Sequence, residues 1–334
     1  MTERAKEKII IGMVGLGKWG RNLLKNFNSL PECLIKYGCD NDPALLEKYS
    51  KEYPKVSFTT DFDSLLNDET IKAMVIATPA PLHYQIARRC LESGKHVFVE
   101  KPVTLNVPEA EELDEIAAKK GLRLMVGHLM LYHPAIAALK LVIDSGELGE
   151  IRCIYTRRLN LGTIRNTENA MWSLAPHDIS IILHLFTGRL KSVAALGSAS
   201  VQKGIEDMVF IDLRFDGGGI GHIHVSWLDP TKIRQTIVVG SRKMAVFDEI
   251  ANSLIIADKG FDRDQDANLK MRSGEDRAVD LSKDEPLKLE CRHFIDCVRT
   301  GREPISNGKN GLAVLKVLSA AESSLKNGGE NELF

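Results

Sequence analysis

Three consecutive residues, Glu100-Lys101-Pro102, place a carboxylate, an amine and a rigid turn at the end of an apolar run. The preceding run, residues 97–99, is predicted to be a buried strand, and charged groups at the end of such a strand are costly to remove from water. Proline ends the strand because it has no backbone N–H to donate. A lysine held there could bind a substrate hydroxyl and help to remove its proton. Lys101 is therefore a candidate catalytic residue, with a surface ion pair as the alternative.

A histidine in the second half of the chain is the other candidate for proton transfer. Pro176 is predicted to begin a helix, so that His177 and Asp178 lie in its first turn. The positive end of the helix dipole favours a neutral imidazole, which is available as a base. We therefore predict that His177 is a second catalytic residue, although a structural histidine would fit this segment taken alone.

A glycine motif near the amino terminus predicts a dinucleotide site. Gly15, Gly17 and Gly20 have G-x-G-x-x-G spacing between a predicted strand and a predicted helix. Such glycines allow a sharp turn and let backbone N–H groups approach a pyrophosphate at the helix N-terminus. The next strand ends at Asp40, whose carboxylate would accept hydrogen bonds from ribose hydroxyls. An ordinary structural turn is the alternative.

The residues around these motifs specify the cofactor further. No arginine follows Asp40 to hold a 2′-phosphate, which favours NAD, whereas Lys18 and Arg21 keep NADP open. The carboxyl ends of parallel strands form the edge at which open α/β sheets bind ligands. Further predicted cofactor contacts lie in three places. They are Lys18 and Trp19 in the glycine motif, Thr78, Pro79 and His83 after the predicted strand "KAMVIAT", and Glu100, Lys101 and Pro102 at the end of the strand described first. For Thr78-Pro79, a turn before a helix is an equally good interpretation.

Two patterns divide the chain. Residues 8–126 alternate short apolar runs with helical segments, which predicts a parallel sheet with helices on both faces. Residues 150–257 contain long runs of alternating apolar and polar residues, typical of a mostly antiparallel sheet covered on one face. A polar segment, residues 259–284, is predicted to be a mobile or surface excursion, and two helices, residues 286–300 and 308–326, follow it.

The predicted fold class is therefore α/β with two domains. Residues 1–127 form an N-terminal Rossmann-type domain with a parallel sheet, which binds NAD. Residues 128–334 form a C-terminal α+β domain with a large, mostly antiparallel open sheet, for substrate binding and oligomerisation. Its C-terminal helices are expected to return towards the first domain.

Composition excludes several classes of protein. Of 334 residues, 44% are hydrophobic and 27% charged, and the net charge of −1 provides no basic field for nucleic acid or a membrane surface. The six cysteines are scattered, without metal-ligand spacing, which favours free thiols in a reducing cytosol and no metal site. The charged amino terminus contains an apolar run too short for a signal peptide or a membrane span. We predict a cytoplasmic protein with no nucleic-acid or membrane partner.

Together, the glycine motif, the Thr-Pro and Glu-Lys-Pro strand ends and the helix-borne histidine resemble the glucose–fructose oxidoreductase/inositol dehydrogenase (Gfo/Idh/MocA) family. The resemblance covers nearly the whole chain, including "GHLMLYHPAI" and the final two helices. It implies that Lys101 and His177 are the catalytic pair. It also implies that Glu100 and Pro102 shape the nicotinamide pocket.

One position departs from the family pattern. Many members have an aspartate four residues before the histidine, where this chain has Ser173. A serine cannot hold a charge there, so a proton relay would have to run through Lys101, His177 and Asp178.

The stretches "NFNSLPECLIKYGCDNDP" and "WSLAPHDIS" look most like the branch that oxidises the C3 hydroxyl of UDP-N-acetylglucosamine or of its uronic acid. Guanidinium groups suit a diphosphate or a uronate carboxylate. Alternating charges on the solvent face of a sheet would produce the same pattern. The candidate substrate-binding residues are Arg157, Arg158, Arg165, Trp172, Ser173, Asp178, Lys232 and Arg234.

The sequence thus predicts an NAD-dependent sugar dehydrogenase, with a UDP-linked substrate between its domains. In this hypothesis His177 takes the hydroxyl proton and Lys101 orients and polarises the oxygen. Two alternatives remain open: a family enzyme that acts on a free sugar or inositol, and a non-catalytic NAD-binding sensor. The exposed face of the C-terminal sheet predicts a homodimer or homotetramer.

Overall fold

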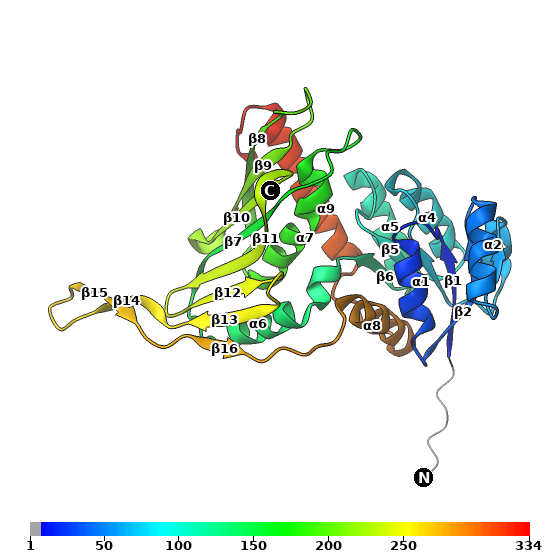
Figure 1. Cartoon of the computed structure of the whole chain (residues 1–334), viewed down its shortest axis with the longest axis horizontal. Coiled ribbons are helices and arrows are strands. Elements are labelled where there is room, and N and C mark those ends of the chain that lie inside the picture. Colours follow the sequence, from blue (N-terminus) through cyan, green and yellow to red (C-terminus); the bar gives the residue numbers. More distant parts are fainter. Residues whose placement is uncertain (1–7) are drawn as a thin grey trace, which may run out of the picture. The chain divides into compact units, whose positions relative to one another are not determined.

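The computed structural model describes residues 8–334, and these form two compact units (Figure 1). The first contains the chain up to Leu129 together with Asp284–Leu315, and the second contains Met130–Lys283 and Lys316–Phe334. The sequence-based boundary counted residues 284–315 with the second domain, whereas their packing assigns them to the first unit. Most of the charged amino terminus used in the signal-peptide argument lies outside the described residues.

A parallel six-stranded sheet forms the centre of the first unit and confirms the predicted Rossmann-type architecture. Because the chain leaves β1 on one side for β2 and β3 and returns on the other side at β4, the carboxyl ends of β1 and β4 form a topological switch point, where such folds bind ligands. The strands, in sheet order, are β3 (Ser57–Thr59), β2 (Cys33–Cys39), β1 (Ile9–Val14), β4 (Ala73–Ile76), β5 (His96–Glu100) and β6 (Leu124–Gly127).

Helices cover this sheet, and several begin with a side-chain cap. Asp42 accepts a hydrogen bond from Ala44 N–H at the start of α2, and Asn106 accepts one from Glu109 N–H at the start of α5. The helices are α1 (Gly20–Asn28), α2 (Pro43–Glu52), α3 (Phe62–Asn67), α4 (His83–Glu92), α5 (Val107–Lys120), α8 (Pro286–Thr300) and the first part of α9 (Gly308–Lys326).

Three phenylalanines join α1, β5 and α8 in the core of the first unit. Phe98 on β5 packs edge-on against Phe27 on α1 and Phe294 on α8, with ring centroids 6.0 and 5.7 Å apart. Phe27 and Phe294 also contact each other, at 6.3 Å. This cluster explains why α8, although distant in sequence, belongs to the first unit.

The second unit is built on a nine-stranded sheet, which confirms the prediction of a large, mostly antiparallel sheet. Among its neighbouring strands, only β7 and β10 pair in parallel within residues 8–334. The strands, in sheet order, are β16 (Arg277–Val279), β13 (Ser253–Ala257), β12 (Met244–Asp248), β11 (Leu228–Gly240), β7 (Ile151–Leu161), β10 (Ile220–Ser226), β9 (Met208–Phe215), β8 (Leu190–Ser198) and β17 (Glu332–Leu333).

The two faces of this sheet differ. One face packs against α7 (Ala170–Leu185) and α6 (Pro134–Asp144), and its side chains are buried. The other face presents apolar side chains that stay partly exposed, among them Leu196, Phe210 and Ile255.

The start of α7 corrects one sequence-based prediction. The helix begins at Ala170, not at Pro176, and the side chain of Asn169 caps it by accepting from Trp172 N–H at 3.1 Å. Pro176 lies inside the helix. An apolar face that includes Ala175 and Ile179 holds the helix against the sheet, so that burial outweighs the hydrogen bond lost at the proline.

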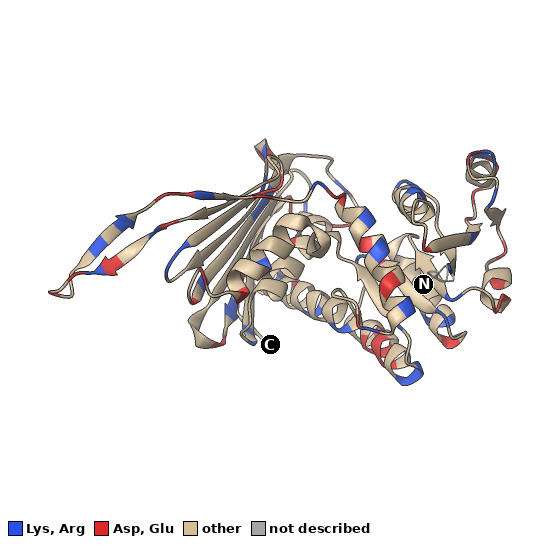
Figure 2. Ribbon diagram, turned by 90° about the horizontal axis from the view of Figure 1, so that it is seen from below, with Lys and Arg blue, Asp and Glu red and all other residues tan. Residues whose placement is uncertain are grey.

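The polar segment at residues 259–284 is a surface excursion, as predicted, but it contains strands. β14 (Lys259–Arg263) and β15 (Leu269–Ser273) form a hairpin, and β16 joins the large sheet. Charged residues alternate with Phe261 and Met271, which pair across the hairpin. Charges of both signs are visible along this hairpin in Figure 2. Among residues 8–334, no helix combines the length and apolar character needed to span a membrane.

Candidate functional site

The glycine motif forms the turn between β1 and α1. Gly15 has a φ of +86°, and a Cβ there would lie 2.6 Å from the carbonyl carbon of Ala77. A Cβ at Gly20 would lie 2.1 Å from the carbonyl oxygen of Gly15. At Gly17, by contrast, a Cβ would meet no atom within 4 Å, so the backbone is open on that side. A tight turn with open backbone at a helix N-terminus suits a pyrophosphate group.

Asp40 connects the second strand to this turn. One carboxylate oxygen accepts from Leu16 N–H at 2.6 Å, and the other accepts from Asp42 N–H at 3.0 Å. Each oxygen keeps a further lone pair, and the side chain is only half-buried. Asp40 can therefore hold the turn and accept a ribose hydroxyl at the same time.

His83 links the turns that follow β4 and β5. Its Nδ1 lies 2.7 Å from the carbonyl oxygen of Pro102, and its Nε2 lies 2.8 Å from that of Thr78. Burial lowers the pKa of His83, and the two carbonyl groups oppose this shift. His83 thus fixes the Thr78-Pro79 turn to the Lys101-Pro102 turn, which brings the predicted residues of both strands to one edge. Pro79 and Lys18 are exposed.

Glu100 is the central group of this edge. The indole Nε1–H of Trp19 donates to one carboxylate oxygen, and the backbone N–H of Lys101 donates to the other at 3.2 Å. The carboxyl group packs against Gly127, where a Cβ would lie 3.0 Å from it. Burial raises the pKa of Glu100 to about 7, while the Trp19 hydrogen bond and the Lys101 charge act in the opposite direction. Glu100 therefore holds together the ends of β5 and β6 and the start of α1.

His128 is a residue of this edge that sequence reasoning missed. It follows β6 and is 1% exposed, and neither ring nitrogen has a hydrogen-bond partner among the described residues. Burial and the charge of Lys101 lower its pKa to about 3, so the ring is neutral at physiological pH. The Thr78 hydroxyl is likewise buried without a partner among residues 8–334. A polar residue that follows the apolar run "LRLMV" after a single glycine was the signal that would have identified His128.

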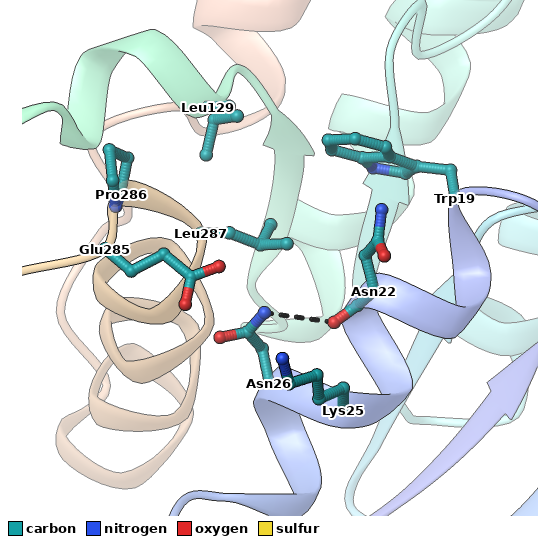
Figure 3. Close-up of a pocket in the computed structure, with 8 residues that line it drawn as sticks. All are labelled: Trp19, Asn22, Lys25, Asn26, Leu129, Glu285, Pro286 and Leu287. Atoms are coloured by element: carbon teal, nitrogen blue, oxygen red, sulfur yellow. Dashed lines mark hydrogen bonds between the residues drawn. The ribbon is translucent and has the colours of Figure 1, made fainter.

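A pocket of about 320 Å³ lies beside Trp19 in the first unit (Figure 3). In the figure, the Trp19 ring forms one wall, Leu129 and Leu287 lie opposite, and the Asn22 amide lies below the ring. Asn26 donates to the carbonyl oxygen of Asn22 at 3.1 Å. The remaining lining residues are Lys25, Glu285 and Pro286.

His177, in the second unit, lies in the middle of α7 rather than in its first turn. The argument that the helix N-terminus keeps its ring neutral is therefore wrong, because the free N–H groups lie near Ala170 instead. Ser173 and Ser180 share its face of the helix, one turn away on either side. The Ser180 hydroxyl donates to the carbonyl oxygen of His177 at 2.7 Å. The imidazole is half-buried and Ser173 is buried.

Asp178 and Arg158 form a buried ion pair in the second unit. Arg158 Nε lies 2.8 Å from an Asp178 oxygen, and its Nη1 lies 3.1 Å from an oxygen of Glu249. The side chains of Asp178 and Arg158 are 2% and 9% exposed. Burial raises the pKa of Asp178, and the Arg158 charge opposes that shift. Both side chains are thus engaged inside the unit, and we assign neither Arg158 to a substrate site nor Asp178 to a proton relay.

The other basic residues predicted to bind substrate do not form one cluster. Arg157 bonds to Gln235 and lies on the sheet face opposite Arg158, because neighbouring residues of a strand alternate. Arg165 pairs with Glu168 in the connection before α7. Arg234 lies directly across from Arg158 and donates to Asn160 at 2.6 Å and to Leu159 and Ile233 carbonyl groups. Lys232 is exposed, and Trp172 is half-buried on α7.

The chain matches the family model of NAD-binding Rossmann-fold oxidoreductases (GFO_IDH_MocA) over residues 9–128. It also matches the C-terminal domain of that family over residues 136–246. The protein therefore belongs to the Gfo/Idh/MocA oxidoreductase family, which confirms the resemblance inferred from its sequence. NAD is its cofactor, and the glycine turn, Asp40 and the unpartnered Thr78 hydroxyl fit it.

Related proteins align over nearly the full chain. The NAD⁺-dependent scyllo-inositol 2-dehydrogenase of Bacillus subtilis is 27% identical, covering 97% of this chain and 96% of that enzyme. UDP-N-acetylglucosamine 3-dehydrogenase of Acidithiobacillus ferrooxidans is 25% identical, covering 94% and 98%. A solved structure of the latter enzyme superposes with a TM-score of 0.83 over 95% of this chain and 98% of that one, at 24% identity. GenD2 from gentamicin A biosynthesis, solved in complex with NAD, has a TM-score of 0.82 at 20% identity and covers 100% and 98%.

Proposed function

We propose that this protein oxidises a secondary hydroxyl of a sugar to a ketone, with C3 of a UDP-linked N-acetylhexosamine or its uronic acid as the target. The observation that carries the oxidoreductase part is the edge of the first unit. There His83 and Glu100 fix Lys101 beside the strand ends that carry the glycine turn. Bound NAD supplies the hydride acceptor. The related UDP-N-acetylglucosamine 3-dehydrogenase supports the choice of substrate.

Two residues have proposed catalytic roles, one in each unit. Lys101 binds and polarises the reacting hydroxyl oxygen. The ring of the nearby His128 is neutral, so one of its nitrogens can accept a hydrogen bond from the Lys101 ammonium group. His177 accepts the hydroxyl proton. Ser173 shares the His177 face of α7, so its hydroxyl can hydrogen-bond near the reacting group but cannot carry charge there.

A free sugar or inositol is the second candidate substrate, and two observations favour it. The scyllo-inositol enzyme covers as much of the chain as the UDP-sugar enzyme, at similar identity. In addition, the basic residues expected to hold a diphosphate are dispersed, with Arg158 locked in an internal ion pair. Arg157, Arg165, Lys232 and Arg234 remain the candidates for a phosphate anchor.

Two further parts of the proposal concern the state of the protein in the cell. The partly exposed apolar residues on the open sheet face, such as Phe210 and Ile255, support a homo-oligomer formed through that face. All six cysteines are free thiols, and five of them are buried, which fits a reducing cytoplasm.

The proposal is tested by NAD⁺ reduction on a panel of UDP-N-acetylhexosamines, their uronates, free hexoses and inositols. A nucleotide-sugar enzyme should be inhibited by UDP in competition with its substrate, because the diphosphate supplies binding energy far from C3. A free-sugar or inositol enzyme should be indifferent to UDP. If NAD⁺ binds but no compound of the panel is oxidised, the result favours the non-catalytic NAD-binding sensor over the proposed activity.

A further inference from the structure

A second buried carboxyl group lies behind Glu100. The buried stripe of α8 includes Leu287, Glu290, Cys291 and Phe294, which have helical i, i+3, i+4, i+7 spacing. Glu290 is 0% exposed, and neither of its oxygens has a hydrogen-bond partner among the described residues. A carboxyl group in such a position needs a physical explanation, because an unsatisfied buried charge is strongly destabilising.

The packing of α8 places Glu290 next to Glu100. Phe294 contacts Phe98 on β5, at 5.7 Å between ring centroids. Glu290 precedes Phe294 by four helical residues, about 6 Å. Glu100 follows Phe98 by two strand residues on the same side of β5, about 6.6 Å. The two carboxyl groups therefore form the next layer after the phenylalanine contact.

The direction of α8 supports this alignment. The helix starts at the carboxyl edge of the sheet, because Leu287 lines the same pocket as Trp19 and Leu129 (Figure 3). It ends at the opposite edge, where Arg299 reaches the carbonyl oxygen of Glu32, just before β2. Moving back along α8 from Phe294 thus leads towards the strand ends, where Glu100 accepts from Trp19.

We propose that Glu290 is a positioning residue that carries a proton at neutral pH and presents a neutral acid group to Glu100. The pair then holds a single negative charge. That charge stays on Glu100, which already accepts hydrogen bonds from Trp19 and from Lys101 N–H, whereas Glu290 has no such donors among the described residues. Glu290 would act on Lys101 through Glu100, which accepts from the Lys101 N–H. That role rests on the proposed function, whereas the protonation of Glu290 does not.

The pKa shifts of the two carboxyl groups agree with a protonated Glu290 and an ionised Glu100. Burial, followed by the charge of Glu100, raises the pKa of Glu290 well above its usual value. Burial also raises the pKa of Glu100, whereas the Trp19 hydrogen bond and the Lys101 charge favour its ionised form. Two carboxylates in one dry site cannot both ionise without strong repulsion. Lys101 is the charged group that acts on Glu100. Cys291, the neighbour of Glu290 on α8, is influenced by both glutamates and also by Cys33 and Glu285. Lys25 and Glu285 line the pocket beside Trp19.

A measurement of stability against pH tests the protonation without substrate or cofactor. A group whose folded-state pKa is raised stabilises the fold at low pH, and this contribution is lost as pH rises above about 4.5 towards the folded-state pKa. E290Q is neutral at every pH and lacks that dependence. The ratio of the folding equilibrium constants of wild type and E290Q should therefore fall by up to about tenfold per pH unit from pH 5 to pH 8. D296N, which removes a partly exposed carboxylate from the same helix, should show a constant ratio.

A constant ratio for E290Q as well would overturn the proposal. If E290Q does not fold, carbon-13 NMR of the wild-type glutamate carboxyl groups decides the question directly. A buried glutamate that remains protonated at pH 7 is expected, and its signal should persist in E100Q, which shows that it does not come from Glu100. A set of glutamates that are all ionised at pH 7, or a protonated signal that disappears in E100Q, contradicts the proposal.

The positioning role is tested by comparing E290Q with E290M. Glutamine keeps the shape and a hydrogen-bond donor towards Glu100, whereas methionine keeps the length without a donor. The indole N–H signal of Trp19, assigned by its loss in W19F, should stay in place in E290Q and move in E290M. NAD⁺ affinity should change less than twofold in E290Q and by more than that in E290M, which presents no neutral donor to Glu100. Equal behaviour of the two variants would mean that Glu290 only fills space. Because neither readout needs turnover, failure of the proposed activity would leave this result interpretable.

Discussion

Replacement of Asp178 by alanine distinguishes an internal ion pair from a proton relay. The variant leaves the Arg158 guanidinium, whose side chain is 9% exposed, with Glu249 as its remaining carboxylate at 3.1 Å. Breaking a buried ion pair by removing one partner costs up to about 3–5 kcal/mol when the other charge stays buried without a partner. Glu249 still faces Arg158, so the cost here should lie towards the lower end of that range. A single domain has only about 5–15 kcal/mol of stability, so the loss should be visible as a large shift of the unfolding midpoint. Urea unfolding followed by circular dichroism measures it.

The double variant with Arg158→Met and Asp178→Leu provides the internal check. Replacing both partners by apolar side chains of similar size removes the uncompensated charge, so most of the lost stability should return. As a surface control, Asp212→Ala removes the carboxylate of the exposed His222–Asp212 pair and should cost less than about 1 kcal/mol. The reasoning fails if Asp178→Ala costs under about 1 kcal/mol and the double variant is no more stable than the single one. If Asp178→Ala is folded but has no turnover, Asp178 would again be a candidate member of the proton relay.

Three further outcomes are expected. Asp40→Ala should weaken NAD⁺ binding by about 1–3 kcal/mol, because it removes a charged acceptor and the hydrogen bonds that hold the glycine turn. If calorimetry shows an unchanged NAD⁺ affinity, Asp40 is not part of the cofactor site. Lys101→Met and His177→Asn should each lower kcat by roughly 10²–10⁴-fold with little effect on NAD⁺ affinity, and near-native turnover of His177→Asn across pH 6–9 would show that another group is the base. His128 has a folded-state pKa of about 3 against 6.5, so it reduces stability as pH falls below 6.5, by about 1.4 kcal/mol per pH unit. His128→Asn should therefore flatten the acid side of the stability curve, and an unchanged slope between pH 5 and 6.5 would contradict the neutral buried ring.

The sequence by itself determined the features that depend on neighbouring residues. Short apolar runs bounded by turns predicted β1, β2, β4 and β5, and the three glycines predicted the turn after β1. Those signals are local, since a strand buried on both faces must be apolar throughout and a turn with a φ of +86° at Gly15 requires glycine. For the same reason, the order of residues along the chain is enough to place Glu100, Lys101 and Asp40 at strand ends.

Only the tertiary structure decided which distant groups meet. The start of α7 was misplaced because Pro176 is a strong local signal, whereas the cap at Asn169 and burial against the sheet hold the longer helix. From the sequence, Asp178 was a candidate for the proton relay. In the structure it pairs with Arg158 on β7, which packs against α7, and that contact could not be seen in the sequence. Glu100 and Glu290 are far apart in the chain, and their proximity depends on the packing of Phe294 against Phe98. Sequence patterns show the periodicity of apolar residues and the positions of turns. The pairing of buried charges depends instead on how separate elements pack. A charged side chain is stable in the interior only where another element supplies its partner or its proton.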